Sequence, residues 1–228
     1  GDTGIESSIQ ASLTRSGIEI DNFVSVNLYN VDLDYQGRYA VDRHDILWGL
    51  NHRSASDEIS TNEPYIAFTR RSATQRDTGL FIHDDWTLIP DKLKLGAGIR
   101  VATTTANGTN VSTNATLLWT PSRTDSAWLK YAQAPRTSAR AEQDVSVLAG
   151  FNVQKTPFGN LPIVQYARPS ADGLNAEKAE GVELGYRKQI STTVSADVTG
   201  YRYRYTNLRS GSQTGLIGCS PAFGAFPL

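Results

Sequence analysis

The sequence predicts an all-β fold whose antiparallel strands follow one another up and down a sheet. Many segments alternate apolar and polar residues at period two, which places every second side chain on the same face of a strand. The links between these segments are alternately short and long. No apolar run approaches the roughly 18 residues that a membrane-spanning helix needs. These observations favour a partial transmembrane β-barrel, whose strands of about 9–11 residues alternate lipid-facing and lumen-facing side chains.

The clearest hairpin covers residues 77–101. Its turn is Pro90-Asp91-Lys92, because Pro fixes φ and Asp can bond to nearby backbone. Its second strand carries Leu93, Leu95, Ala97, Ile99 and Val101 on one face, and Lys94, Gly96, Gly98 and Arg100 on the other. The cleanest alternation runs from Asn27 to Tyr39. Roughly nine strands are expected in all; the others lie near 8–14, where Thr14–Gly17 is expected to break the strand, and near 44–53, 114–120, 127–132, 182–187 and 194–205.

The lengths of the links suggest two different rims. Short links are expected near 40–43, 90–92, 121–125 and 189–192, and long extracellular loops near 54–76, 103–113, 135–178 and 209–228. Short turns at one rim and long loops at the other are typical of outer-membrane barrels. The stretch 135–178 exceeds the usual length of a structureless loop, so it is expected to contain its own hairpin, Val145–Val153 with Leu161–Arg168.

The phase of the segment 192–208 stays open. Val194, Ala196 and Val198 continue an apolar face, but Tyr201, Tyr203 and Tyr205 fall in the opposite phase. Either a bulge shifts the register or the tyrosines face inward.

Composition excludes several classes of function. The chain has 22 Lys+Arg and 23 Asp+Glu, a net charge of -1, so no basic excess favours a nucleic-acid partner. Cys219 is the single cysteine, which rules out an internal disulfide framework. The chain contains no Met and begins without a leader pattern. It is therefore expected to be a piece of a longer protein.

Several segments, in order, resemble TonB-dependent outer-membrane receptors. They are Gly79-Leu-Phe-Ile-His-Asp-Asp-Trp through Gly98-Ile-Arg100, Ala115-Thr-Leu-Leu-Trp-Thr-Pro121, Trp128-Leu-Lys-Tyr-Ala-Gln-Ala-Pro-Arg-Thr-Ser138, Leu174 through Glu183-Leu-Gly-Tyr-Arg187, and Tyr201 to Ser210. Together they cover roughly residues 25–210. The resemblance implies that residues 1–228 are part of a receptor barrel of about 22 strands, plugged by an amino-terminal domain.

The resemblance also implies a function. Such receptors lie in the outer membrane of Gram-negative bacteria, in contact with its lipid. They import scarce ligands, most often ferric siderophores, with energy from the TonB complex, which reaches them through the plug. The sequence shows no plug, no TonB-contacting segment and no terminal strand, so transport by this piece alone is not expected. The ligand, the plug, the terminal strands and the ability of the piece to fold alone stay open. The alternatives are a passive porin or autotransporter-type barrel and a soluble β-rich binding or adhesion module.

No enzymatic site, metal site or cofactor is expected. His83, Asp84 and Asp85 cannot converge, because adjacent strand residues point to opposite faces. Ligand contacts are expected from charged residues facing the lumen and from loop residues, since cations and aromatic rings suit anionic, aromatic iron chelates. The candidates are Arg100, Lys130, Glu183 and Arg187, with the loop residues Phe151, Phe158, Tyr166 and Arg168. In the alternative interpretation these lumenal charges only pair with one another or with the plug.

Overall fold

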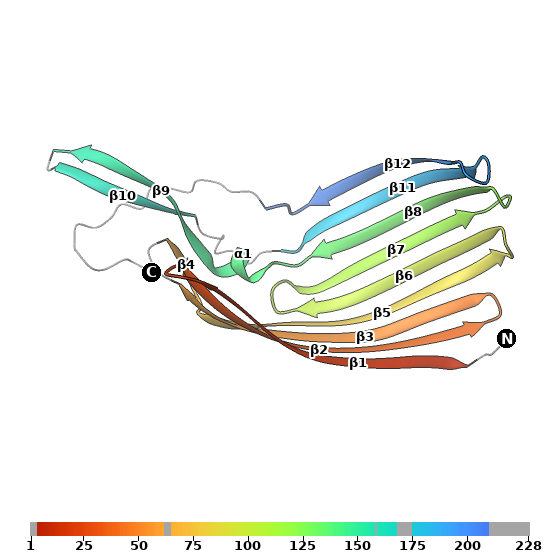
Figure 1. Cartoon of the computed structure of the whole chain (residues 1–228), viewed down its shortest axis with the longest axis horizontal. Helices are drawn as coiled ribbons and strands as arrows, with labels where there is room; N and C mark the ends of the chain where they lie inside the picture. The colour runs from red at the N-terminus through yellow and green to blue at the C-terminus, as the bar shows by residue number, and fades with distance from the viewer. Residues whose placement is uncertain (1–3, 62–64, 158, 168–174, 210–228) are drawn as a thin grey trace.

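The computed structural model describes residues 4–61, 65–157, 159–167 and 175–209, most of them in β-strands. A nine-stranded antiparallel sheet dominates (Figure 1). In order across the sheet, its strands are β1 (Ile5–Ile20), β2 (Val24–Val41), β3 (His44–Thr61), β5 (Ser72–Ile89), β6 (Leu93–Thr104), β7 (Gly108–Trp119), β8 (Asp125–Arg136), β11 (Glu177–Gln189) and β12 (Ser195–Thr206). Each strand pairs with the one before it in the sheet, so the predicted up-and-down meander of about nine strands is confirmed.

The links predicted to be short all fall at one end of the sheet, and the links predicted to be long begin at the other end. The short turns after β2, β5, β7 and β11 lie together at the right-hand end of Figure 1, here called the short-turn rim. At two of these turns Asp42 and Asp91 adopt positive φ, 50° and 58°, a conformation that Asp tolerates better than most residues. The opposite end is called the long-loop rim.

Several strands continue further toward the long-loop rim than predicted. The segment expected as a loop at 54–76 is strand up to Thr61 and again from Ser72, with the short strand β4 (Ile66–Phe68) between. The loop expected at 103–113 shrinks to residues 105–107. Thr and Ser are compatible with strands when both faces meet water, and Thr103 Oγ1 lies 2.9 Å from Thr109 Oγ1 across the hairpin.

The expected break in the first strand is also wrong. Residues 14–17 pair with residues 27–30 inside an uninterrupted β1–β2 ladder, and the turn comes at residues 21–23. Polar residues alone therefore do not end a strand that has a paired neighbour.

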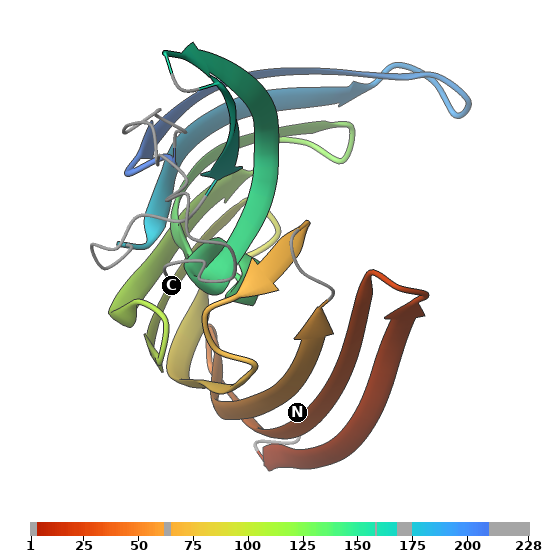
Figure 2. The ribbon, with the colours of Figure 1, turned by 90° about the vertical axis from the view of Figure 1, so that its left-hand side faces the viewer.

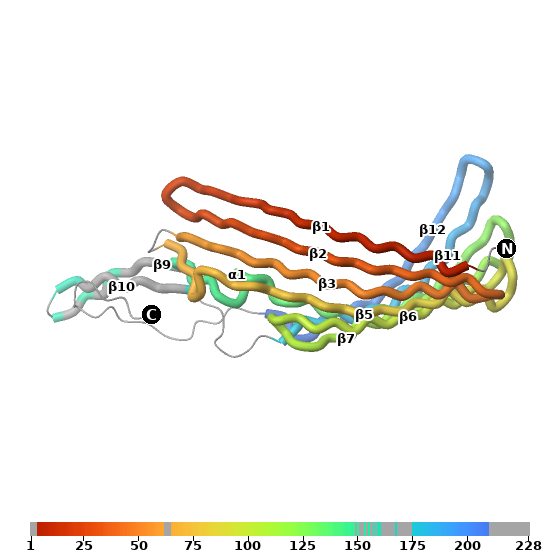
Figure 3. Tube along the Cα trace, turned by 90° about the horizontal axis from the view of Figure 1, so that it is seen from below, coloured from red at the N-terminus to blue at the C-terminus, as the bar shows by residue number. Residues whose placement is uncertain are grey.

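The connection between β8 and β11 holds the hairpin that was predicted there. Strands β9 (Val145–Thr156) and β10 (Gly159–Ala167) pair with each other, and β4 adds a third strand to them. The hairpin extends beyond the long-loop rim (Figures 1 and 3). The short helix α1 (Arg140–Asp144), which precedes it, was not predicted. The loop expected at 209–228 lies, apart from Arg209, outside the described residues.

The nine-stranded sheet is curved, and its two faces differ in chemistry. In Figure 2, α1 and β4 lie inside the curve. Arg140 of α1 bonds to Asp57 of β3 at 3.0 Å, so the face that carries Asp57 is the concave face. Cross-strand partners share a face. The register therefore places Arg100, Lys130 and Glu183 on this concave face as well.

The convex face carries the large apolar side chains, most of them exposed. This apolar band includes Leu33, Leu50, Leu80, Ile82, Ile99, Leu117, Leu129, Leu184 and Val198, with Trp86, Trp119 and Tyr186 toward the short-turn rim. Among the described residues, the only buried apolar side chains are Ile59, Ala102 and Ala176, so no apolar core lies between packed sheets. The sheet is therefore part of a transmembrane barrel wall rather than half of a soluble sandwich. No helix in the described part of the chain is long and apolar enough to cross a membrane.

The open question about the tyrosines is answered by β12. It pairs with β11 from Ser195 to Thr206 without a register shift. Tyr201, Tyr203 and Tyr205 therefore lie on the concave face, beside Glu183 and Gly181.

Candidate ligand-binding surface

A column of three tyrosines is the most exposed aromatic feature of the concave face. Tyr201 and Tyr203 have ring centroids 5.4 Å apart, and Tyr203 and Tyr205 are 6.4 Å apart. Their exposed fractions are 71%, 49% and 57%. Rings so exposed on a polar face are available for stacking with an aromatic ligand. We call Tyr201, Tyr203 and Tyr205 the tyrosine column.

Glycine on the neighbouring strand makes room for this column. A Cβ added to Gly181 would lie 2.2 Å from the Tyr203 ring, far inside van der Waals contact. A Cβ added to Gly185 would likewise lie 2.1 Å from the Trp128 ring. Because Gly181 and Gly185 of β11 have no side chains, both rings can lie against the sheet.

One predicted site residue, Glu183, stands directly beside the tyrosine column, and Lys130 lies one strand further along the concave face. Glu183 lies opposite Tyr201 in the register and opposite Lys130 on its other side. Its Oε1 accepts a hydrogen bond from Trp128 Nε1 at 2.7 Å and lies 3.3 Å from Lys130 Nζ. The Lys130 ammonium is 5.6 Å from the centre of the Trp128 ring. Lys130 thus keeps a half-exposed charge next to aromatic rings.

The other two predicted strand residues lie elsewhere on the concave face. Arg100 Nη2 donates to Asn51 Oδ1 at 2.9 Å and to Asp77 Oδ1 at 3.1 Å, on strands β3 and β5. Arg187 is 3.4 Å from Asp197 near the short-turn rim. The four predicted residues therefore form three separate ion pairs, and only Lys130 and Glu183 meet.

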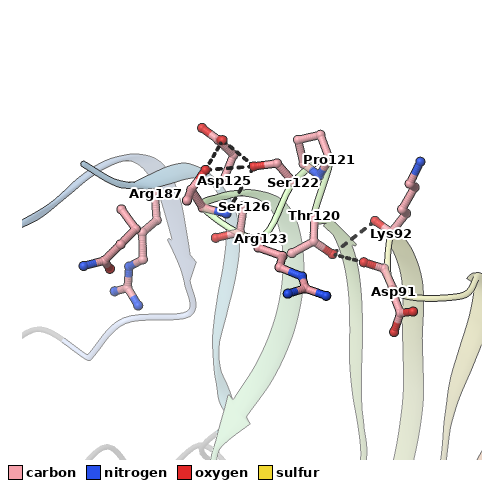
Figure 4. Close-up of a pocket in the computed structure, with 11 residues that line it drawn as sticks. Asp91, Lys92, Thr120, Pro121, Ser122, Arg123, Asp125, Ser126 and Arg187 are labelled. Atoms are coloured by element: carbon pink, nitrogen blue, oxygen red, sulfur yellow. Dashed lines mark hydrogen bonds between the residues drawn. The ribbon is translucent and has the colours of Figure 1, made fainter. Parts of the chain in front are cut away.

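Arg187 also lines a polar cavity of about 510 Å³ at the short-turn rim (Figure 4). Its walls are the turns after β5 and β7. Thr120 Oγ1 donates to the Asp91 carbonyl at 3.1 Å, and Ser122 Oγ donates to Asp125 Oδ2 at 2.6 Å. The bond from Thr120 joins two neighbouring turns, and the bond from Ser122 fixes the conformation of the turn between β7 and β8.

Helix α1 organises the long-loop rim through charged contacts. Glu142 accepts hydrogen bonds from Arg136 at 2.6 Å and from the Ala139 N–H at 2.7 Å, and it also pairs with Arg209. Burial disfavours the charged form of Glu142, but these donors outweigh it and hold the pKa of Glu142 at about 2. Arg136 also binds Glu177 at 3.0 Å. The Glu142 carboxylate thus ties α1 to the end of β8 and to Arg209 after β12, and Arg136 extends the network to Glu177 of β11.

A second group of ion pairs holds α1 over the concave face. Asp144 binds Arg70 at 2.7 Å and also pairs with Arg140, which in turn binds Asp57. Asp57 and Arg70 are distant in sequence from α1, so local patterns did not reveal the group. The run Arg140-Ala-Glu-Gln-Asp144, rich in helix formers, was the available signal.

The loop residues proposed as ligand contacts fall in or near the β9–β10 hairpin. Phe151 is in β9 and Tyr166 is in β10. Phe158 and Arg168 lie outside the described residues. In the part of the chain that the structure describes, no three His, Cys, Asp or Glu residues are grouped to hold a metal ion.

An antiparallel wall with an apolar convex face and a charged concave face defines part of a transmembrane β-barrel. Residues 2–223 match the family model "TonB dependent receptor-like, beta-barrel", and the chain therefore belongs to this family. The resemblance inferred from the ordered segments is thereby confirmed. No curated protein sequence matches the chain.

Solved structures share the fold. The ferric enterobactin receptor PfeA in complex with BCV-L6 aligns with a TM-score of 0.68 and 18% identity, over 90% of this chain and 33% of that one. The siderophore receptor PirA from Pseudomonas aeruginosa aligns with a TM-score of 0.64 and 16% identity, over 87% of this chain and 36% of PirA. PirA from Acinetobacter baumannii aligns with a TM-score of 0.61 and 13% identity, over 88% of this chain and 31% of that receptor. The chain thus spans about a third of the length of these receptors.

Proposed function

We propose that the protein containing this barrel segment is an outer-membrane receptor of a Gram-negative bacterium that binds a ferric siderophore and imports it with energy from the TonB complex. The observation that carries this proposal is the exposed tyrosine column next to Lys130 on the concave face. Aromatic and cationic groups together suit an anionic chelate with aromatic rings. The similar fold of the ferric enterobactin receptor PfeA, a mutant of which has been solved in complex with enterobactin, supports the proposal. The family consists of transport receptors, so we propose no enzymatic activity.

The ligand contacts divide into two groups in this proposal. The tyrosine column and Lys130 contact the ligand on the barrel wall, while Glu183 orients Lys130. Arg100 and Arg187 are already paired with wall carboxylates, so they set the charge of the lumen and contact the ligand only by exchanging partners. Phe151 and Tyr166, with Phe158 and Arg168, supply the second group of ligand contacts.

Ligand affinity of the full-length protein tests the wall contacts. Replacing Tyr201 and Tyr203 together by Ala should weaken binding of a ferric catecholate, measured by quenching of tryptophan fluorescence. One aromatic contact contributes about 0.5–1.5 kcal/mol, so the loss should be roughly 5- to 150-fold for the pair. Tyr131→Ala is the matched control, because that tyrosine is exposed on the convex face. Wild-type affinity in the double variant would refute the assignment.

Energy dependence separates a receptor from a passive channel. Uptake of the labelled chelate by intact cells should stop when a protonophore collapses the proton gradient, whereas binding to the cell surface should persist. Uptake that continues unchanged after the gradient is lost would support the porin alternative instead.

A further inference from the structure

Three basic residues on the convex side of β11 and β12 lack the acidic partners that concave basic residues have, whereas Lys188, near the short-turn rim, pairs with Asp125 at 3.0 Å. On the concave face Arg53, Arg100, Lys130 and Arg187 each have an acidic partner within 4 Å. Arg202, Arg204 and Lys178 lie on the convex face and are exposed. Within the described residues their side chains form no hydrogen bond or ion pair. We call Arg202, Arg204 and Lys178 the basic patch.

The basic patch lies where the apolar band ends, toward the long-loop rim. Along β12 the convex positions pass from Val198 and Gly200 to Arg202 and Arg204. Charged residues at such a boundary meet the headgroup region of a bilayer. Glu180, the carboxylate opposite Arg204 in the register, forms no ion pair with it within 4 Å. The patch therefore carries a net positive charge.

An apolar groove of about 660 Å³ runs from this patch along the apolar band. Val182, Leu184, Tyr186 and Val198 line it, and Arg202 also contributes to its lining. Gly200 leaves the groove open, because a Cβ added there would meet no atom within 4 Å. An apolar channel with a cation at one end matches the shape and charge of a lipid with an anionic headgroup.

We propose that Arg202 and Arg204 bind the phosphate group of an anionic lipid whose acyl chain lies in the groove over Gly200. A guanidinium offers several N–H donors in a planar array that suits phosphate oxygens. Lys178 adds a third positive charge, and the acyl chain covers Leu184 and Val198. The inference rests on the proposed location in the outer membrane, with the long-loop rim facing outward. It assigns a site on the barrel exterior that is independent of the ligand in the lumen.

The test uses the full-length protein in lipid nanodiscs of dimyristoyl phosphatidylcholine that contain a minority of dimyristoyl phosphatidylglycerol. Native mass spectrometry after mild detergent release should find phosphatidylglycerol enriched on the wild-type protein. Arg202→Gln with Arg204→Gln should reduce this enrichment by more than about tenfold, because two charge-assisted contacts are lost. Gly200→Leu should reduce it as well, since the new side chain fills the groove. Arg15→Gln is the matched control. Arg15 is a cation on the convex face of β1, where it lies over the Tyr29 ring of β2, and the variant should retain the lipid.

The outcomes separate this site from the proposed function. Equal phosphatidylglycerol retention by the wild type, the double variant and Gly200→Leu would overturn the lipid site. Thermal stabilisation by inorganic phosphate as large as that by the lipid would also overturn it, because the acyl chain would then be irrelevant. Binding of the ferric chelate is measured on the same samples. Lipid retention without chelate binding would refute the siderophore proposal alone, and variants that lose lipid but bind chelate would support the separate site.

Discussion

The two faces of β8 should respond in opposite ways to the same substitution. Leu129 lies on the convex face, 47% exposed, between Leu117 and Leu184 on the neighbouring strands. Replacing it by Arg places a charge in the middle of the apolar band. Arginine on the lipid face of a barrel costs about 2–4 kcal/mol at the midplane. The folding equilibrium should therefore fall by roughly 30- to 1,000-fold, at about 1.4 kcal/mol per factor of ten.

Thr116→Arg is the matched control. Thr116 lies on the concave face between Lys130 and Gly96, where the new side chain remains in water and can reach Glu183. Only the like charge of Lys130 opposes it, so the expected cost is about 0.2–1 kcal/mol.

Both variants are compared in the full-length protein, refolded into phosphatidylcholine vesicles. The free energy of unfolding comes from urea titrations followed by tryptophan fluorescence, and folded yield comes from heat-modifiable gel mobility. Equal loss at Leu129 and Thr116 would show that the convex face does not contact lipid, and the assignment of the two faces would be wrong.

Three further predictions follow from local contacts. Ala97→Arg should cost less than Leu129→Arg in the same titration, because Asp84 lies opposite Ala97, and adding Asp84→Ala should restore the full cost. The pKa of the Glu142 carboxyl is lowered from 4.5 to about 2, so its contribution to the stability of the loop is complete above pH 4.5 and is lost as the pH falls toward 2. Pepsin should therefore cleave residues 137–157 faster as the pH falls through this window. Glu142→Gln should remove the pH dependence. Gly181→Ala should displace the Tyr203 ring and weaken chelate binding about 2- to 12-fold at unchanged folded yield, measured by fluorescence quenching.

Periodicity predicted the faces well wherever one face meets lipid. The expected apolar set on 93–101 lies together on the convex face, and the polar set that includes Lys94 and Arg100 lies on the concave face. This succeeds because side-chain direction has a period of two and lipid accepts only apolar groups in the band. The same reasoning failed beyond the band, where both faces of a strand meet water. There the alternation disappears although the backbone ladder continues, and residues 54–61 were mistaken for loop.

The candidate site was predictable only in part for the same reason. Lys130 and Glu183 were predicted to face the lumen because they alternate with apolar residues in their strands, and the register places both on the concave face. The tyrosine column remained ambiguous, because Arg202 and Arg204 put polar groups on the other side of that strand. The network around Glu142 joins residues of β8, β11 and α1 with Arg209, which follows β12, so only the folded chain brings its members together.

One charged residue breaks the apolar pattern, and its contacts show how the wall accommodates it. Asp84 and Asp85 are adjacent in the strand, so their side chains point to opposite faces. Asp85 lies on the concave face, with its Oδ1 3.3 Å from His83 Nε2, and Asp84 lies on the convex face. The prediction that these three residues cannot converge is thus confirmed. Asp84 lies in the apolar band, where an isolated carboxylate would be costly, but its Oδ2 is 2.7 Å from His44 Nδ1. The His44 ring in turn stacks on Trp86, with centroids 5.3 Å apart. The pair lies toward the short-turn rim, where the imidazole of His44 on the neighbouring strand gives the Asp84 carboxylate a hydrogen-bonding partner on the lipid side of the wall.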